Sequence, residues 1–244
     1  MAIVTGAGRG IGAATAHALA DRGARVVAVG SDEAELVPTA DAIGAHPLVA
    51  DVRDPQHAQR VIETTLELFG HVDVVVANAG LGHAGDFATM SPERIDDLIA
   101  VNVRAPMLLA RAALPQMIIR ESGALIFISS VAGGLLVPRE AVYSATKAAV
   151  EAFAEPLREE LRGSGVTVST VMPGVVATSF FEARGEPYSR RFPRPIPPER
   201  VAAAVLRAVE RGVPRIVVPR WFAVPLRLRG AVPAIYRRLA RRFG

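Results

Sequence analysis

The chain has 244 residues, of which 50% are hydrophobic, and it carries a formal net charge of +4. This length and apolar content predict one domain with a large core. The absence of cysteine excludes disulfides and thiolate chemistry. The five histidines show no paired ligand spacing, so we predict no metal site.

The charge is distributed unevenly. Residues 1–183 hold 13 basic and 21 acidic side chains, whereas residues 184–244 hold 15 basic and 3 acidic ones. A basic tail is compatible with a nucleic-acid or an anionic-membrane partner. No apolar run approaches the roughly 20 residues that span a bilayer, and the N-terminus lacks a signal-peptide pattern. We therefore expect a cytoplasmic protein.

Short apolar runs alternate with helical patterns along the chain. Strands are predicted at residues 2–5, 25–29, 47–50, 73–77, 124–129, 166–171 and 215–218. Helices are predicted at residues 11–22, 32–43, 55–69, 92–118, 141–162 and 198–211. The strands are continuously apolar, which is typical of strands covered on both faces. The alternation predicts an α/β fold with a doubly wound parallel sheet in a three-layer αβα arrangement, a single domain over residues 1–218.

A basic tail at residues 219–244 follows the predicted domain. Its prolines at 225 and 233 predict only short helices, and residues 235–243 form a candidate basic amphipathic helix. Such a segment can lie on an anionic membrane, cover an active site, pack against a second subunit or form a solvated face. No nucleic-acid-binding motif is present, and we expect no nucleic-acid partner.

The first predicted strand leads directly into the glycine-rich turn Thr5-Gly6-Ala7-Gly8-Arg9-Gly10-Ile11-Gly12, which a helix follows. Glycines let the backbone approach a pyrophosphate, and the helix N-terminus offers N–H groups and the positive end of its dipole. The strand–turn–helix context favours dinucleotide binding over an ordinary glycine-rich turn.

Polar residues follow three further predicted strands, at the edge where ligands bind in such sheets. They are Asp51 with Val52, the triplet Asn78-Ala79-Gly80, and Ser129-Ser130. Each has a structural alternative, because Asp51 can cap a helix, Asn78 can brace a turn and Ser130 can simply end a strand.

Lys147 is the only lysine of the chain and lies four residues after Tyr143. Residues at this spacing share one face of a helix. Lysine is a compact point charge, whereas arginine is a wide planar fork, so a site that needs a small cation beside a phenol requires lysine. The alternative is a chance pair in which Tyr143 only packs.

Taken together, these residues resemble the short-chain dehydrogenase/reductase family up to about residue 180. The shared features are the turn at 5–12, Asp51-Val52, Asn78-Ala79-Gly80, Asn102, Ser130 thirteen residues before Tyr143, Tyr143-x-x-x-Lys147, and Pro173-Gly174 followed by Thr178. The resemblance implies a Rossmann fold and hydride transfer between a nicotinamide cofactor and a carbonyl or secondary alcohol. It also implies a homo-oligomer formed through the helices at 92–118 and 141–162.

The resemblance assigns four catalytic residues. Tyr143 is the expected general acid or base, and Ser130 the expected partner of the substrate oxygen. Lys147 is expected to hold the nicotinamide ribose, and Asn102 to support a water-linked proton relay to the lysine. An unperturbed phenol has a pKa of about 10, and we expect the Lys147 ammonium and the cofactor's positive ring to favour phenolate. The alternative from another class is a non-catalytic dinucleotide sensor or membrane-tethered scaffold on the same fold.

The cofactor-binding residues that the motifs and the resemblance predict are Gly6, Gly8, Arg9, Ile11, Gly12, Ser31, Asp51, Val52, Asn78, Ala79, Gly80, Tyr143, Lys147, Pro173, Gly174 and Thr178. An acid at the end of the second strand selects NAD, and basic residues accommodate the 2′-phosphate of NADP. By position the acid would fall at Gly30 and the arginine at Ser31, so the chain has neither. Because the acid is absent and Arg9 and Ser31 can reach a phosphate, we favour NADP(H) over NAD(H). Asp32 could oppose this choice, although with Glu35 it also fits a helix capping box.

The family's substrate lid follows the Pro-Gly turn, here at about residues 175–198. The lid carries Phe180, Phe181, Tyr188 and Phe192, and the loop after Ser130 carries Val131, Leu135, Leu136 and Val137. These side chains predict a hydrophobic ketone or secondary alcohol as substrate; alternatively, they only pack the lid. The lid's proline- and arginine-rich part at 184–198 is expected to be irregular.

Overall fold

The structure is a computed structural model that describes residues 1–135, 137–234 and 236–238. Within these residues, seven parallel strands form one sheet in the order β3-β2-β1-β4-β5-β6-β7. The strands are β1 (Ala2–Thr5), β2 (Val26–Gly30), β3 (His46–Val49), β4 (Val74–Ala77), β5 (Gly123–Ile128), β6 (Val166–Pro173) and β7 (Arg215–Val218). Each matches a predicted strand. The strand order reverses between β1 and β4, which is the switch point where doubly wound sheets bind ligands.

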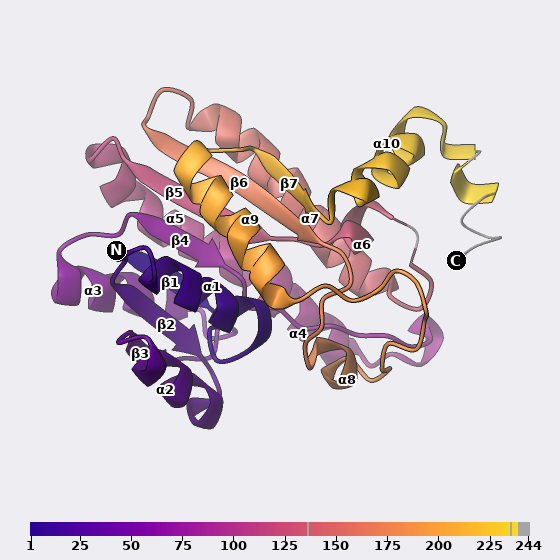
Figure 1. Cartoon of the computed structure of the whole chain (residues 1–244), viewed down its shortest axis with the longest axis horizontal. Helices are drawn as coiled ribbons and strands as arrows, with labels where there is room; N and C mark the ends of the chain where they lie inside the picture. The colour runs from indigo at the N-terminus through magenta and orange to yellow at the C-terminus, as the bar shows by residue number, and fades with distance from the viewer. Residues whose placement is uncertain (136, 235, 239–244) are drawn as a thin grey trace.

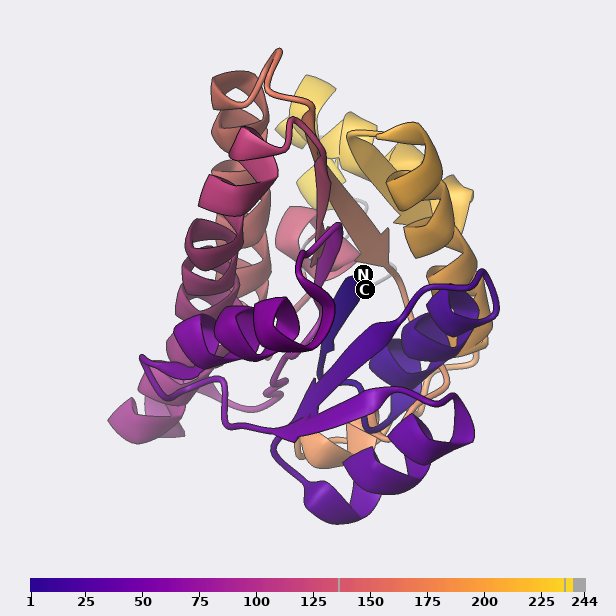
Figure 2. The same cartoon turned by 90° about the vertical axis from the view of Figure 1, so that its left-hand side faces the viewer.

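Helices cover both faces of the sheet (Figures 1 and 2). The longer ones are α1 (Gly10–Ala20), α2 (Glu33–Ala42), α3 (His57–Phe69), α4 (Pro92–Ile99), α5 (Ala105–Ile119), α7 (Ala141–Glu160) and α9 (Pro198–Arg211). Helices α3, α5 and α7 share a core with one face, and α1, α2 and α9 share a core with the other. The predicted three-layer fold is confirmed.

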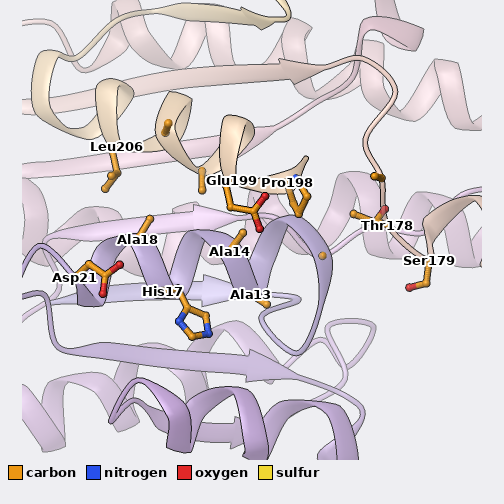
Figure 3. A pocket seen from close by; sticks show the side chains of 14 residues that line it. Ala13, Ala14, His17, Ala18, Asp21, Thr178, Ser179, Pro198, Glu199 and Leu206 are labelled. Carbon is orange, nitrogen blue, oxygen red and sulfur yellow. The ribbon is translucent and has the colours of Figure 1, made fainter. Parts of the chain in front are cut away.

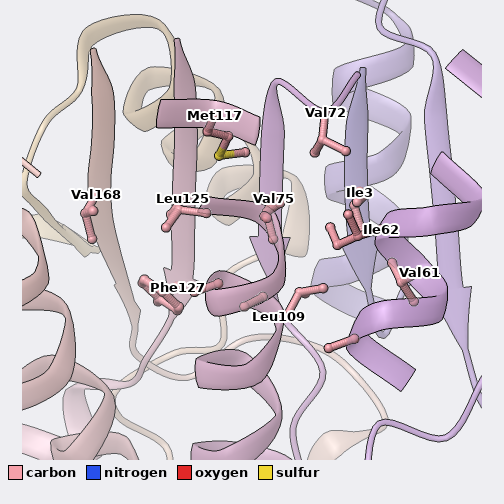
Figure 4. Close-up of a cluster of buried hydrophobic side chains, with 14 of the residues drawn as sticks. Ile3, Val61, Ile62, Val72, Val75, Leu109, Met117, Leu125, Phe127 and Val168 are labelled. Carbon is pink, nitrogen blue, oxygen red and sulfur yellow. The ribbon is translucent and has the colours of Figure 1, made fainter. Parts of the chain in front are cut away.

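Each inner strand supplies both cores, because successive side chains point to opposite faces. Ile3 packs with Val75, Leu125 and Phe127 beneath α3 and α5 (Figure 4), whereas its neighbour Val4 belongs to the core under α1 and α9. Burial on both faces is the physical reason why these strands are continuously apolar.

The predicted helix at 92–118 is interrupted. A π-helical turn, Ala100–Arg104, separates α4 from α5, and such turns often occur at functional sites. The combined helix Pro92–Ile119 is long and apolar enough to cross a membrane by composition, yet 44% of its most apolar window is buried in the protein. Its apolar character is explained in part by Leu109 and Met117, which pack on the sheet.

The lid leaves the sheet after β6 and returns at α9. Its two ends are joined by a bridge between Val176 and Ile196, and the short helix α8 (Phe180–Ala183) lies between them. After α8 the segment up to residue 195 is irregular, as predicted.

The tail begins with two short helices, η3 (Arg220–Phe222) and α10 (Ala223–Ala231), and α10 packs beside α6 (Val131–Gly134; Figure 1). The candidate helix at 235–243 lies mostly outside the described residues, as does Leu136 of the loop after Ser130.

Candidate active site

The turn after β1 is shaped by glycine. Gly6 has a φ of +65°, a left-handed conformation that favours glycine. A Cβ atom on Gly12 would overlap the carbonyl oxygen of Gly6, so no side chain fits there. Arg9 is the N-cap residue of α1, and within the part of the chain that the structure describes its side chain forms no hydrogen bond that caps the helix. An uncapped helix start beside a glycine turn fits a dinucleotide pyrophosphate.

Asn78 braces this turn from β4. Its side-chain amide donates to the carbonyl oxygens of Thr5 (2.9 Å) and Gly6 (3.2 Å). The Thr5 hydroxyl in turn accepts from the backbone N–H groups of Asn78 and Ala79, both at 3.1 Å. These hydrogen bonds show that Asn78 braces the glycine turn, which was the structural alternative for this residue. They also hold Ala79 beside the turn. Direct contact of these residues with the cofactor stays a prediction.

Asp51 does not cap a helix, because α3 begins at His57 with Gln56 as its N-cap. The Asp51 carboxylate accepts from the Arg53 backbone N–H at 2.9 Å and pairs with its guanidinium at 2.7 Å. This arginine holds the pKa of Asp51 below its usual range. Asp51 and Val52 lie after β3 as expected, but the Asp51 carboxylate is already paired.

At the end of β2, Asp32 caps α2 by accepting from the N–H groups of Ala34 (3.0 Å) and Glu35 (3.3 Å). One half of the predicted capping box is thereby confirmed. The Glu35 carboxylate pairs instead with Arg9 at 2.9 Å. Both side chains are exposed, at 55% for Arg9 and 37% for Glu35, and exposed pairs are worth little. Arg9 is therefore available to a stronger anion. Ser31 lies beside Asp32 and is exposed.

The Ser130, Tyr143 and Lys147 side chains come together where β5 ends and α7 begins. Their residues are 9%, 7% and 5% exposed, respectively. The Ser130 hydroxyl accepts from the Ala132 N–H at 3.1 Å. The Lys147 ammonium donates to the Ile128 carbonyl at 3.0 Å and lies 5.9 Å from the centre of the Tyr143 ring.

Burial controls the protonation of this group. Desolvation raises the pKa of the Tyr143 phenol well above its usual value, and hydrogen bonding with Ser130 opposes the shift only in part. Desolvation also lowers the pKa of Lys147 to about 8. We expected Lys147 to favour the phenolate, but the protein itself favours the neutral phenol. The reason is that the ammonium is directed at the Ile128 carbonyl while the phenol is fully desolvated.

Asn102 lies in the π-helical turn and ties three elements together. Its amide donates to the Leu81 carbonyl (2.9 Å) and the Thr146 hydroxyl (3.0 Å), and its oxygen accepts from the Leu81 N–H (2.8 Å). A Cβ atom on Gly80 would lie 3.4 Å from both Asn102 Oδ1 and Lys147 Nζ. Asn102 is therefore close to the lysine, as expected, whereas its part in a proton relay stays a prediction.

The lid brings two further predicted features into the site. Thr178 lies against the start of α1, because a Cβ atom on Gly10 would be 3.1 Å from the Thr178 methyl group. The Phe180 ring packs on Tyr143 with 5.6 Å between ring centres, and Phe181 and Tyr188 continue the aromatic row at 5.8 and 5.2 Å. Gly8 lies in the turn after β1, Ile11 lies in the first turn of α1, and Pro173 is the last residue of β6.

Sequence reasoning missed how the tail contributes. A Cβ atom on Gly174 would overlap the Phe222 ring, and one on Gly134 would overlap the Leu226 side chain. Phe222 and Leu226 also join Val131 in a small core beside Ser130. Gly174 and Gly134 are the only trace of these contacts in the sequence, and the structure is needed to show that Phe222 and Leu226 occupy the space beside them.

A groove of about 730 Å³ runs between α1 and α9, from Gly10 and Thr178 to Asp21 and Leu206 (Figure 3). Its lining does not include Ser130 or Tyr143. The groove therefore adjoins the expected cofactor site but lies apart from the Ser130–Tyr143–Lys147 group, over which the lid packs.

A doubly wound parallel sheet with a glycine turn after β1 at its switch point is the architecture of a dinucleotide-binding protein. The sequence profile of the family described as short chain dehydrogenase matches residues 1–189. Versicolorin reductase 1 of Aspergillus parasiticus is 38% identical over 195 residues, which cover 77% of this chain and 74% of that protein. The chain belongs to the short-chain dehydrogenase family and is an oxidoreductase that uses a nicotinamide cofactor.

Two solved structures are similar over most of the chain. The 3-ketoacyl-(acyl-carrier-protein) reductase from Brucella melitensis, complexed with NADH, has a TM-score of 0.83 and 28% identity and covers 89% of this chain and 95% of its own. A metagenomic short-chain oxidoreductase in complex with NADP has a TM-score of 0.77 and 35% identity and covers 88% of this chain and 95% of its own.

Proposed function

We propose that the protein is a cytoplasmic, NADP(H)-preferring carbonyl reductase or alcohol dehydrogenase that acts on a hydrophobic ketone or secondary alcohol. The observation that carries this proposal is the buried group of Ser130, Tyr143 and Lys147 beneath the aromatic row of the lid. The alternative of a non-catalytic sensor would not require a desolvated phenol beside a serine hydroxyl.

When bound, the nicotinamide cofactor supplies or accepts the hydride. An unperturbed phenol already holds its proton at pH 7, and burial raises the pKa of Tyr143 further, so Tyr143 can donate its proton to the substrate oxygen in the reductive direction. The Ser130 hydroxyl accepts from the Ala132 N–H and hydrogen-bonds with Tyr143, and we expect its proton to turn to the substrate oxygen when substrate binds. Lys147 is held in place by the Ile128 carbonyl.

Three observations support NADP(H). Gly30 leaves no acid at the end of β2, Ser31 is exposed there, and the Arg9–Glu35 pair is exposed enough to exchange its carboxylate for a phosphate. In addition, the metagenomic relative complexed with NADP shares 35% identity with this chain, and the relative complexed with NADH shares 28%.

The hydrophobic substrate class is supported by the walls of the site. Phe180 covers Tyr143 from the lid and Phe181 packs on Phe180, while Val131 and Leu226 contribute apolar surface near Ser130. Apolar walls with a few convergent polar groups are typical of small-molecule sites.

The test is reduction of a ketone panel of graded size and polarity with NADPH and with NADH. We expect turnover to favour NADPH and bulky apolar ketones. In Tyr143→Phe, kcat should fall by about 10²- to 10⁴-fold, whereas loss of one cofactor contact should weaken NADPH binding by only about tenfold or less. Turnover by Tyr143→Phe at the wild-type rate would refute its role, and cofactor binding without turnover of any ketone would favour the sensor.

A second proposal concerns the tail, which we expect to contact an anionic membrane. Phe192 and Trp221 stack at 5.3 Å between ring centres while 68% and 42% exposed, and Val224 nearby is 68% exposed. Exposed aromatic and basic residues together suit a lipid interface. Anionic vesicles should pellet the wild type more than a Trp221→Ser/Val224→Ser variant, whereas Phe87→Ser, at an exposed phenylalanine elsewhere, should pellet like the wild type. Equal pelleting of all three proteins would exclude this contact.

A further inference from the structure

A buried ion pair joins the lid to the helix that carries Tyr143. Glu140 directly precedes α7, three residues before Tyr143, and Arg184 directly follows α8 in the lid. Their side chains form a salt bridge in which each is only 11% exposed. The two residues are far apart in the sequence, and the reaction as proposed above uses neither.

The lid segment that carries Arg184 covers the reaction centre. The Phe180 ring packs on Tyr143, and a Cβ atom on Gly82 would lie 2.5 Å from Phe180 Cζ and 2.9 Å from Arg184 Cβ. The lid therefore fits closely over the loop that follows β4. Because Tyr143 is only 7% exposed in this arrangement, a substrate reaches it only when the lid moves.

A buried ion pair has the energetics that a lid needs if it is to close and open again in each turnover. Removing one partner of such a pair is strongly destabilising because it leaves the other charge buried and uncompensated, whereas an apolar replacement of both partners is often neutral or stabilising. The pair therefore holds the lid in one place, and because its net contribution is small the closure stays reversible.

We propose that the Glu140–Arg184 ion pair is the reversible fastening of the substrate lid, which positions Phe180 over Tyr143 and releases it between turnovers. The two are positioning residues and do not touch the reacting atoms. The proposal rests on the proposed function in one respect, namely that the reaction takes place at Tyr143 beneath the lid.

The lid provides a matched control. Arg139 and Glu186 form a second ion pair between the segment before α7 and the lid, but their side chains are 51% and 41% exposed. An exposed pair contributes little, so Glu186→Gln should leave the lid as closed as in the wild type.

The test is hydrogen exchange, measured by mass spectrometry, of the amide of Ala84, which donates to the Arg184 carbonyl of the lid, and of the amides of Ala183 and Arg184 in α8. Glu140→Gln, which leaves the Arg184 charge unpaired, should speed their exchange by about 100-fold. The double variant Glu140→Met/Arg184→Met should exchange at the wild-type rate or more slowly, and Glu186→Gln within about threefold of the wild type. Thermal unfolding of each variant checks that the remainder of the protein stays folded.

The kinetic measurements separate this role from general destabilisation. Glu140→Gln should raise KM more than it lowers kcat, and the double variant should restore KM but lower kcat, because a lid without buried charges opens more slowly. Wild-type exchange in Glu140→Gln would overturn the proposal, as would equal acceleration in Glu186→Gln or in the double variant. The exchange measurement needs no activity, so an inactive wild type with the expected exchange pattern would refute the proposed function and leave the fastening intact.

Discussion

The contact between Gly174 and Phe222 decides whether the first turns of the tail belong to the folded domain. Phe222 is 6% exposed, and its ring occupies the space that a Cβ atom on Gly174 would need. The ring also stacks on Trp221 at 3.8 Å between ring centres. Burying a phenylalanine side chain contributes about 1.5–3 kcal/mol, and the cavity left by truncation adds to the loss.

We therefore expect Phe222→Ala to lower the free energy of unfolding by about 3–5 kcal/mol. Gly174→Ala should lower it by about 1–3 kcal/mol, because the added methyl group and the ring cannot both occupy this space. In the double variant the methyl group enters the vacated space. The double variant should consequently be more stable, by about 1 kcal/mol or more, than the sum of the two single effects predicts.

Urea denaturation of the wild type and the three variants measures these differences through the midpoint and slope of each transition. Strictly additive effects would refute the reasoning, since they would mean that residues 174 and 222 do not touch. A Phe222→Ala loss below about 1 kcal/mol would show that residues 219–231 are a loosely attached tail, as a domain boundary at 218 implies.

Three further predictions concern charge and assembly. The pKa of Lys147 is near 8 in the folded protein and about 10.4 in an unfolded chain, so the unfolded state binds its proton more tightly between these values. Wild-type stability should therefore rise by about 2 kcal/mol relative to Lys147→Met between pH 8 and pH 10, as measured by urea denaturation at each pH; a pH-independent difference would contradict the lowered pKa. Glu35→Gln should free Arg9 and raise the NADPH-over-NADH ratio of kcat/KM by about two- to fivefold, whereas an unchanged ratio would exclude Arg9 from cofactor selection. Ile119, 83% exposed on α5, should become part of a homo-oligomer interface, so light scattering of Ile119→Arg should show smaller particles than the wild type; equal masses would exclude this part of α5.

The fold was predictable because its signals are local. Each strand is a short apolar run between turn residues, and each strand's two neighbours in sequence are helices, which leaves few topologies other than a doubly wound sheet. The glycine turn was predictable for the same reason, since Gly6 and Gly12 lie within one strand–turn–helix unit. The π-helical turn at Ala100–Arg104 was not, because the hydrogen bonds of Asn102 within it go to Leu81 and Thr146, which lie far away in the sequence.

Long-range pairs were missed for a different reason. Glu140 and Arg184 meet only after the lid folds back over α7, and in the sequence each is one more charged residue in a charged region. The Glu35–Arg9 pair was missed for the same reason. The capping box is a local pattern of Asp32 and Glu35, whereas Arg9, which Glu35 contacts, lies in a turn far away in the sequence. Charge complementarity between distant segments has no periodicity, so it can be assigned only once the chain path is known.

The protonation of Tyr143 shows what residue spacing alone leaves out of the electrostatics. Spacing places Lys147 one helical turn away and suggests that an ammonium stabilises the phenolate. Burial cannot be inferred from spacing. Here it disfavours the charged form of both groups, so it raises the pKa of Tyr143 and lowers the pKa of Lys147. In the protein alone, burial therefore favours the protonated phenol over the phenolate. A phenol that holds its proton at neutral pH suits the reduction of a ketone, in which the forming alkoxide must receive a proton as the hydride arrives.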